Sequence, residues 1–162
     1  MMVDTMHPSD WEAVRRIYAE GMATGKATFD TEVPDWAKWN AGHLPSPRLV
    51  AREDANVLGW VALMPVSARV CFRGVAEVSI YIGKEARGKG VGRMLLDAIG
   101  PASEAEGLWM LFSSIHADNA PSLALHAGCG FRVIGRREKI AMRDGEWCDT
   151  IWMERRSRVV GV

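Results

Sequence analysis

The sequence has little cysteine, no net charge and no long apolar run. Its three cysteines, Cys71, Cys129 and Cys148, are too few and too widely spaced for a disulfide framework or a zinc ribbon. The 20 basic residues equal the 20 acidic ones, so the chain lacks the basic excess that nucleic-acid binding requires. The longest stretch without a charged residue, 55–68, is shorter than the roughly 20 residues of a membrane-spanning helix. We therefore expect neither a nucleic acid nor a membrane as partner.

The N-terminus also lacks the features of a targeting segment. Met1 to Asp4 has neither a basic flank nor an apolar core. Together with the scarcity of cysteine, this predicts a cytoplasmic protein. The length of 162 residues fits a single domain spanning 1–162, and 48% hydrophobic residues are enough for a proper core.

Hydrophobic periodicity predicts a mixed α/β chain. Helical spacing occurs in residues 8–24, 35–43, 91–99 and 119–128, and strand-like runs occur in 48–52, 57–64, 76–82, 109–115, 131–140 and 147–154. The Gly100-Pro101 pair predicts a kink or an interruption in the third helix. Strands 76–82 and 109–115 flank one helix, so we expect them to be parallel and joined by a right-handed crossover.

The sharpest motif is a glycine-rich loop between a strand and a helix, Arg87-Gly88-Lys89-Gly90-Val91-Gly92. Glycines allow the main chain to approach a ligand closely, and free N–H groups at the start of a helix bind anions. Arg87, Lys89 and the following Arg93 add positive charge. The motif therefore predicts a site for a cofactor that carries phosphate.

Three alternatives compete for this loop. Residues 83–90 nearly match the nucleotide P-loop, G-x-x-x-x-G-K-[ST], but Gly90 stands where the magnesium-binding hydroxyl is needed. The dinucleotide fingerprint needs G-x-G-x-x-G and an acidic residue at a later strand end, whereas Glu104 and Glu106 lie near the end of a helix. The third alternative is a glycine-rich turn without any ligand.

Several segments of the sequence resemble those of a known family. The Arg-x-x-Gly-x-Gly pattern looks like the acyl-CoA pyrophosphate loop of the GNAT family of N-acetyltransferases, and Asn119 with the segment 128–131 matches that family's later motif. Thr28-Phe29-Asp30, Phe72-Arg73-Gly74 and the strand from Glu77 resemble the branch of phosphinothricin and methionine sulfoximine acetyltransferases. The resemblance covers nearly the whole chain. It implies a mostly antiparallel sheet, splayed between two parallel strands and flanked by about four helices.

The resemblance also implies where acetyl-CoA binds. The cosubstrate would lie in a V-shaped opening between strands 76–82 and 109–115. Main-chain groups of Ile80, Tyr81 and Ile82 would contact the pantetheine arm, and Asn119 would form a hydrogen bond with the arm or with the thioester end. The pyrophosphate would be held by Arg87, Gly88, Lys89, Gly90, Val91, Gly92 and Arg93.

Acetyl transfer to an amine needs a base, because an ammonium group has no lone pair. Glu77 is the candidate base, since it lies on the polar side of a strand whose other side is apolar, and the resembled branch carries a glutamate in this place. A solvated or ion-paired strand glutamate is the alternative. We expect a backbone N–H on the same strand, which ends at Ile82, to stabilise the oxyanion of a tetrahedral intermediate.

A second proton transfer concerns the departing thiolate. Many members of the family have a tyrosine where this chain has His126, and an imidazole can pass a proton near neutral pH. Tyr81 is the alternative donor, and a purely structural histidine is the remaining interpretation of His126. The four histidines show no metal-ligand spacing, so we expect no metal.

The acceptor would meet three further residues. Arg73 offers a guanidinium for the carboxylate of a small amino acid, and Phe72 offers an apolar wall. The resemblance implies that Phe29, in an early loop, helps to close the pocket. The alternative for Arg73 is a surface turn residue beside Gly74.

These observations predict an acetyl-CoA-dependent N-acetyltransferase acting on the amine of a small L-amino acid or analogue, such as phosphinothricin or methionine sulfoximine. Another amine acceptor (an aminoglycoside, a polyamine or a peptide N-terminus) and a non-catalytic acyl-CoA-binding module are the alternatives. A binding module would not need Glu77 and His126, and both are present. The resemblance also implies a homodimer.

Overall fold

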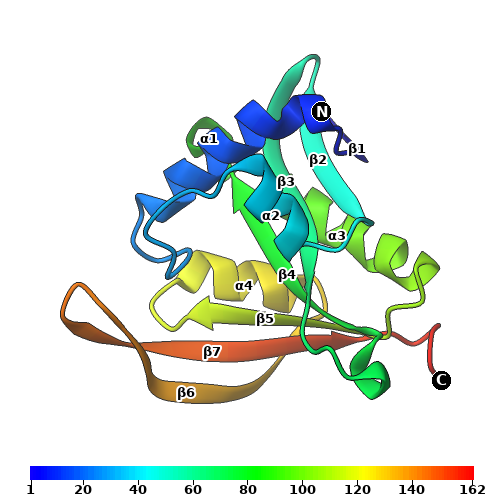
Figure 1. Ribbon diagram of the computed structural model, residues 1–162, viewed down its shortest axis with the longest axis vertical. Helices are drawn as coiled ribbons and strands as arrows, with labels where there is room; N and C mark the ends of the chain where they lie inside the picture. Colours follow the sequence, from blue (N-terminus) through cyan, green and yellow to red (C-terminus); the bar gives the residue numbers. More distant parts are fainter.

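The computed structural model describes residues 1–162 and contains one seven-stranded mixed sheet in the order β1-β2-β3-β4-β5-β7-β6 (Figure 1). The strands are β1 (Met2–Thr5), β2 (Arg48–Glu53), β3 (Asn56–Pro65), β4 (Val75–Ile82), β5 (Met110–His116), β6 (Arg132–Arg143) and β7 (Glu146–Arg156). Only β4 and β5 are parallel, and every other neighbouring pair is antiparallel. The predicted mixed α/β fold and the parallel pair are therefore confirmed.

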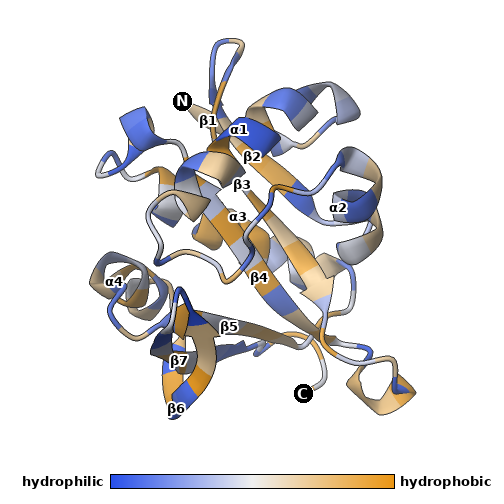
Figure 2. Cartoon of the chain, turned by 60° about the vertical axis from the view of Figure 1, so that its left-hand side comes forward, coloured by the Kyte–Doolittle hydropathy of each residue, from blue (hydrophilic) through white to orange (hydrophobic).

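Four α-helices cover the sheet: α1 (Trp11–Met22), α2 (Trp36–Gly42), α3 (Val91–Ala105) and α4 (Ala120–Gly128). Helix α3 packs in one hydrophobic cluster with Val61, Leu63 and Ala76 of the central strands. Helices α1 and α2 pack in a second cluster around Trp60. Figure 2 shows apolar stretches of the central strands between these helices, whose outer surfaces are more hydrophilic. None of the helices is long and apolar enough to cross a membrane.

Strand β4 alternates as its sequence predicts. Ala76 and Val78 are buried in the cluster with α3, whereas Tyr81 packs against the cluster of α1 and α2. Since side chains alternate across a strand, Glu77 and Ser79 share the face of Tyr81. The polar side of β4 therefore lies under α1 and α2.

Strands β4 and β5 separate soon after they begin. Their parallel pairing covers three residue pairs, from Val75–Met110 to Glu77–Phe112, and then stops. Beyond Glu77 the backbone of β4 still pairs with β3, but its other edge has no strand partner. This gap is the splayed opening that the resemblance implies.

Two local features differ from the sequence prediction. A short strand, β1, pairs with β2 where no element was expected. Helix α3 is not interrupted at Gly100-Pro101 but continues to Ala105, because the loss of one N–H donor is outweighed by buried packing on both sides, at Leu96, Ile99 and Ser103. Asp10, at the N-cap position of α1, makes no side-chain hydrogen bond to that helix. Its carboxylate instead accepts hydrogen bonds from the backbone of His7 and the side chain of Arg52.

Strands β6 and β7 form a long hairpin at the edge of the sheet (Figure 1). In the turn between them, Asp144 and Gly145 have positive φ angles of 52° and 80°. Several large apolar side chains of this hairpin are exposed: Val133, Ile134, Ile140, Met142 and Trp147.

Candidate active site

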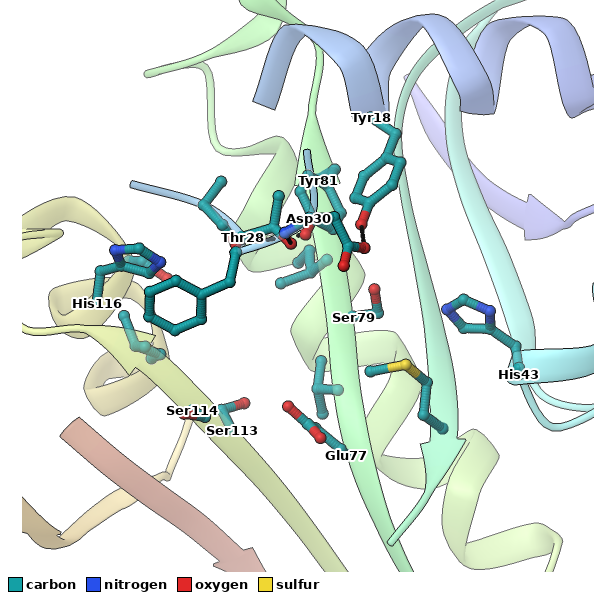
Figure 3. A pocket seen from close by; sticks show the side chains of 18 of the residues that line it. Tyr18, Thr28, Asp30, His43, Glu77, Ser79, Tyr81, Ser113, Ser114 and His116 are labelled. Atoms are coloured by element: carbon teal, nitrogen blue, oxygen red, sulfur yellow. Dashed lines mark hydrogen bonds between the residues drawn. The ribbon is translucent and has the colours of Figure 1, made fainter. Parts of the chain in front are cut away.

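A cavity of about 570 Å³ lies where β4 and β5 separate, on the sheet face covered by α1 and α2 (Figure 3). Its lining comes from β4, β5, α2, α4 and the loop of residues 23–35 that joins α1 to α2. Because these segments are far apart in the sequence, the cavity exists only in the folded chain.

Glu77 is the last β4 residue that pairs with β5, and its carboxylate faces the cavity. Figure 3 shows it across the gap from Ser113 and Ser114 of β5. Burial raises the pKa of Glu77 above its ordinary value of 4.5, and no partner opposes this rise. A carboxylate of raised pKa that is open to a cavity is suited to take a proton from a ligand.

His126 of α4 also lines the cavity and is buried. Its Nδ1 lies 2.8 Å from the carbonyl oxygen of Ser122. A carbonyl can only accept, so Nδ1 carries the proton and Nε2 presents a lone pair. Burial also lowers the pKa of His126, which favours the neutral ring. A proton-donor role therefore requires that the ring be protonated first.

Tyr81, the alternative donor, keeps its proton more firmly. Burial, together with the neighbouring Tyr18, raises the pKa of Tyr81 well above its ordinary value. Its hydroxyl donates to the carbonyl of Ala27 at 3.3 Å. Tyr81 is thus a protonated group that is already used to hold loop 23–35.

Loop 23–35 spans the cavity and is attached on both sides of the β4–β5 gap. On the β4 side, Tyr18 of α1 donates a short hydrogen bond to Asp30. On the β5 side, the ring of Phe29 stacks on His116 with centroids 4.3 Å apart. Further bonds to its backbone carbonyls come from Asn119 to Lys26 at 3.1 Å and from Arg143 to Thr28 at 2.6 Å. The loop therefore closes one face of the cavity.

The side of the cavity toward α2 is aromatic. Trp39 and His43 stack with centroids 4.1 Å apart, and Trp60 meets Trp39 edge-on at 5.5 Å. Met64 adds a thioether from β3. This side offers a largely apolar surface to a ligand.

The glycine loop lies outside the cavity, before α3. Gly88 and Gly90 have positive φ angles of 74° and 81°, although a Cβ at either position would meet open space. Glycine is therefore required there by backbone conformation and not by crowding. The N–H groups of residues 88–90 donate to no backbone carbonyl. The first-turn N–H groups of α3 also lack helical acceptors, so the loop fits a diphosphate.

The basic residues of this loop have different surroundings. Arg87 donates to the carbonyls of Ile82 and Glu20, so it holds the loop against β4 and α1. Arg93 pairs with Asp97. Lys89 is exposed and has no ion pair, which leaves it free for an anion.

The structure brings six of the predicted site residues to the cavity: Phe29, Glu77, Ile80, Tyr81, Asn119 and His126. It does not bring Phe72 and Arg73 there. Both are exposed in the β3–β4 connection, and Arg73 lies over the ring of Trp109 at 5.3 Å. Their predicted role in acceptor binding stays untested. Asn119 caps α4 through its Oδ1, so its amide is already shared between that cap and the Lys26 carbonyl.

Several lining residues escaped the sequence prediction, among them Asp30, Trp39, His43, Ser113 and His116. The alternation of β4 could have pointed to Ser79 beside Glu77, but no local pattern links His43 to that strand. No cluster of three or more His, Cys, Asp or Glu side chains is arranged to hold a metal ion.

Comparison with known proteins agrees with this geometry. Residues 11–131 match the model of the "Acetyltransferase (GNAT) family". The chain is 33% identical over 159 residues to the phosphinothricin N-acetyltransferase of Alcaligenes faecalis, covering 94% of this chain and 81% of that protein. It is 35% identical over 134 residues to the L-methionine sulfoximine/L-methionine sulfone acetyltransferase of Pseudomonas aeruginosa, covering 82% and 73%.

A solved structure supports the same relationship. The GNAT superfamily phosphinothricin acetyltransferase of Sinorhizobium meliloti, in complex with acetyl-CoA, superposes with a TM-score of 0.86 at 29% identity, over 96% of this chain and 87% of that one. The match of the family model to most of the chain, the sequence identity and the shared fold lead to one conclusion. The chain belongs to the GNAT family and is an acetyl-CoA-dependent N-acetyltransferase.

Proposed function

We propose that the protein transfers the acetyl group of acetyl-CoA to the α-amine of a small L-amino acid or analogue of the methionine sulfoximine, methionine sulfone or phosphinothricin type. The observation that carries this proposal is the unpaired, partly buried carboxylate of Glu77 at the point where β4 and β5 separate. The named activities of the related proteins support the acceptor class.

The charges that line the cavity favour an acceptor with both signs of charge. Asp30, Glu32 and Glu77 contribute carboxylates, and Lys26 and Lys38 contribute ammonium groups. A polyamine or an aminoglycoside would be better served by a cavity with acidic residues alone. The mixed lining therefore supports an amino acid over a polycation.

In the proposed mechanism, Glu77 removes a proton from the acceptor ammonium, directly or through one water. The freed nitrogen lone pair attacks the acetyl carbonyl carbon, and the nitrogen of the resulting tetrahedral intermediate carries a positive charge. This nitrogen loses a second proton, which balances the one that the thiolate takes up, and the carbon–sulfur bond breaks as the neutral amide forms. The proton taken by Glu77 passes to solvent. Acetyl-CoA supplies the activated thioester, and a backbone N–H of β4 stabilises the oxyanion.

The departing thiolate takes up one proton. His126 and Tyr81 are the two candidate donors, and each lines the cavity. His126 supplies a proton only after Nε2 has been protonated, whereas the proton of Tyr81 is engaged with Ala27. A thiolate can also take its proton from water, so we expect neither residue to be indispensable.

The cosubstrate would be held mainly by backbone groups. The free edge of β4, at Ile80, Tyr81 and Ile82, would pair with the pantetheine amides. The N–H groups from Gly88 into the first turn of α3 would bind the diphosphate, with Lys89 as the free cation.

A thiol-release assay tests the proposed function. Acetyl-CoA is supplied with free amino acids, methionine sulfoximine, methionine sulfone, phosphinothricin, a polyamine and an aminoglycoside. We expect acceptor-dependent thiol release with one or more of the amino-acid analogues and only background with the polycations. Release with the polyamine or the aminoglycoside alone would instead establish the other amine class. No release above background with any acceptor would overturn the proposal.

We also propose a homodimer and a cytoplasmic location, as the sequence predicts. The exposed apolar side chains of the β6–β7 hairpin support the homodimer, because a monomer seldom leaves such a group of side chains in water. Strand β6 also lies at the edge of the sheet, where its unpaired backbone groups can pair with another chain unless they are covered.

A further inference from the structure

Unpaired buried polar atoms are concentrated around the cavity. Seven buried side-chain nitrogen or oxygen atoms in the whole chain have no hydrogen-bond partner. Five of them belong to residues that line the cavity: Trp39, His43, Trp60, Ser113 and His116. A buried polar atom without a partner costs about 1–3 kcal/mol, and such atoms in a native structure call for an explanation. A polar ligand in the cavity provides one.

Three of these five residues form a single group at α2 and the adjoining part of β3. Trp39, His43 and Trp60 contact one another through their rings. Figure 3 shows His43 on the side of the cavity away from Ser113 and Ser114, with Glu77 and Ser79 of β4 between the two sides. The group therefore lies at the end of the cavity away from the β4–β5 gap.

The protonation state of His43 follows from its one hydrogen bond. Its Nδ1 lies 2.7 Å from the carbonyl oxygen of Trp39, which can only accept, so Nδ1 carries the hydrogen. Burial, and then the nearby positive charge of Arg48, lower the pKa of His43, so the ring is neutral at neutral pH. The unpartnered Nε2 therefore carries a lone pair on the side of the ring that Figure 3 shows turned toward the cavity. Less than 1 Å² of this atom is accessible, so a donor reaches it only when the side chains over it shift.

The position of the base sets the direction in which an acceptor extends. The acceptor amine must lie near Glu77 at the gap, where the thioester is attacked. Met64 is the register partner of Glu77 on β3, and Trp60 is that of Tyr81, so β3 continues the cavity floor toward α2. An alkyl side chain placed over Met64 and Trp60 would bring its tip to His43.

We propose that His43 is a specificity-determining residue, which accepts a hydrogen bond from the tip of the acceptor's side chain and so selects an amino acid whose neutral side chain ends in an N–H or O–H donor. This inference rests on the proposed function and deepens it. Methionine sulfoximine has such a donor, its sulfoximine N–H. Methionine sulfone has nearly the same shape but carries an oxygen there, whose lone pairs would face that of Nε2.

Two variants of His43 separate the hydrogen bond from packing. His43→Phe keeps an aromatic ring against Trp39 and removes the acceptor atom. His43→Gln supplies an amide oxygen in its place. The exposed His7 lies outside the cavity, and His7→Phe is the matched control.

The experiment measures the ratio of kcat/KM for methionine sulfoximine to that for methionine sulfone in each variant. A ratio cancels differences in folded fraction. We expect a preference of about tenfold for the sulfoximine in the unmodified chain and in His7→Phe, expressed mainly in KM, because one neutral hydrogen bond distinguishes the two acceptors. We expect a ratio near one in His43→Phe and a restored preference in His43→Gln. Quenching of tryptophan fluorescence in the CoA-bound protein measures the dissociation constants of the two acceptors. Their ratio should show the same preference without any catalysis.

The outcomes separate this inference from the proposed function. If both acceptors are acetylated and His43→Phe leaves the ratio unchanged, or lowers both rates equally, the inference is wrong and the proposed function stands. If neither acceptor is bound or acetylated, both the inference and this acceptor class are wrong.

Discussion

Burial sets the protonation states of the few side chains that face the cavity. It raises the pKa of the Glu77 carboxyl and lowers the pKa of the His126 and His43 rings. Each shift favours the uncharged form, as expected for groups removed from water without a partner of opposite charge. The chemistry of the site therefore depends on neutral imidazoles and a carboxylate that holds its proton more tightly than usual.

Replacing Glu77 by Gln should lower kcat/KM by at least about a hundredfold, because the general base is lost. In the unmodified chain, kcat/KM should fall as the pH drops through the raised pKa of Glu77, above the ordinary 4.5. A pH profile of both proteins checks this, and an E77Q enzyme with an unchanged rate across the profile would exclude Glu77 as base.

The same substitution carries its own control for folding. The folded-state pKa of Glu77 is raised, so its ionisation costs stability once the pH exceeds the unfolded value of about 4.5. Gln cannot ionise, and E77Q should melt at or above the temperature of the unmodified chain at neutral pH. A marked drop in Tm would show that Glu77 has a structural role.

Removal of the His126 side chain should reduce kcat by less than about tenfold at pH 8, because a neutral ring supplies little acid catalysis there. Steady-state rates of His126→Ala at pH 6 and pH 8 test this expectation. A loss of a hundredfold or more at pH 8 would establish His126 as the proton donor in spite of its lowered pKa.

At the scale of elements, the proposed diphosphate site depends on the backbone conformation of the glycine loop and the first turn of α3. Gly90→Ala places a side chain at a φ of 81°, which costs about 1–2 kcal/mol or forces the loop to move. Gly92→Ala keeps a helical φ, and its Cβ meets only the flexible tip of Leu125 at 2.8 Å. Calorimetric titration with CoA should show weaker binding by about tenfold for Gly90→Ala and a smaller change for Gly92→Ala. Equal affinities for both variants would contradict a role for this backbone.

Loop 23–35 is the element that closes the acceptor side of the cavity. Tyr18→Phe removes the hydrogen bond to Asp30 and should loosen the loop without touching the CoA loop. We expect KM for the acceptor to rise several-fold, because the free energy of one hydrogen bond to a carboxylate is lost. The Kd for CoA should stay unchanged. An unchanged acceptor KM would show that this contact does not hold the cavity closed.

Elements with a strong local pattern were predictable from the sequence. The alternation of β4 and the spacing of α3 are regular because each element buries one face against the same core, and this regularity can be read along the element's own sequence. Strand β1 was missed because four residues carry too little pattern, and its stability depends on pairing with β2. Helix α3 continues through Pro101 because tertiary packing outweighs local propensity.

At the scale of the whole molecule, the proposed acetyl-CoA site and the proposed acceptor site both depend on the gap between β4 and β5 of one sheet. Local patterns could place Glu77 on the polar side of β4 and Gly88–Gly92 before and at the start of α3, while the roles of these residues stay predictions. The site could not be predicted where distant segments meet, as at His43 and Ser113, since no short pattern records that contact. Phe72 and Arg73 belong to a local motif but lie exposed outside the cavity lining, and their predicted role in acceptor binding stays a prediction.

The β6–β7 hairpin gives a prediction at the same scale. Sedimentation velocity should give a mass of twice the 17.9 kDa chain. Trp147→Lys, on the exposed face of the hairpin, should shift the distribution toward the monomer. A monomer at high concentration in the unmodified chain would contradict the proposed homodimer.

The central claim is that an acceptor amine beside Glu77 takes the acetyl group in the β4–β5 gap. Its most direct measurement is product analysis by mass spectrometry and NMR after incubation with acetyl-CoA and L-methionine sulfoximine. The account predicts one equivalent of acceptor acetylated on the α-nitrogen for each equivalent of CoA thiol released. Thiol release without any acetylated acceptor, or acetylation at the sulfoximine nitrogen, would contradict it.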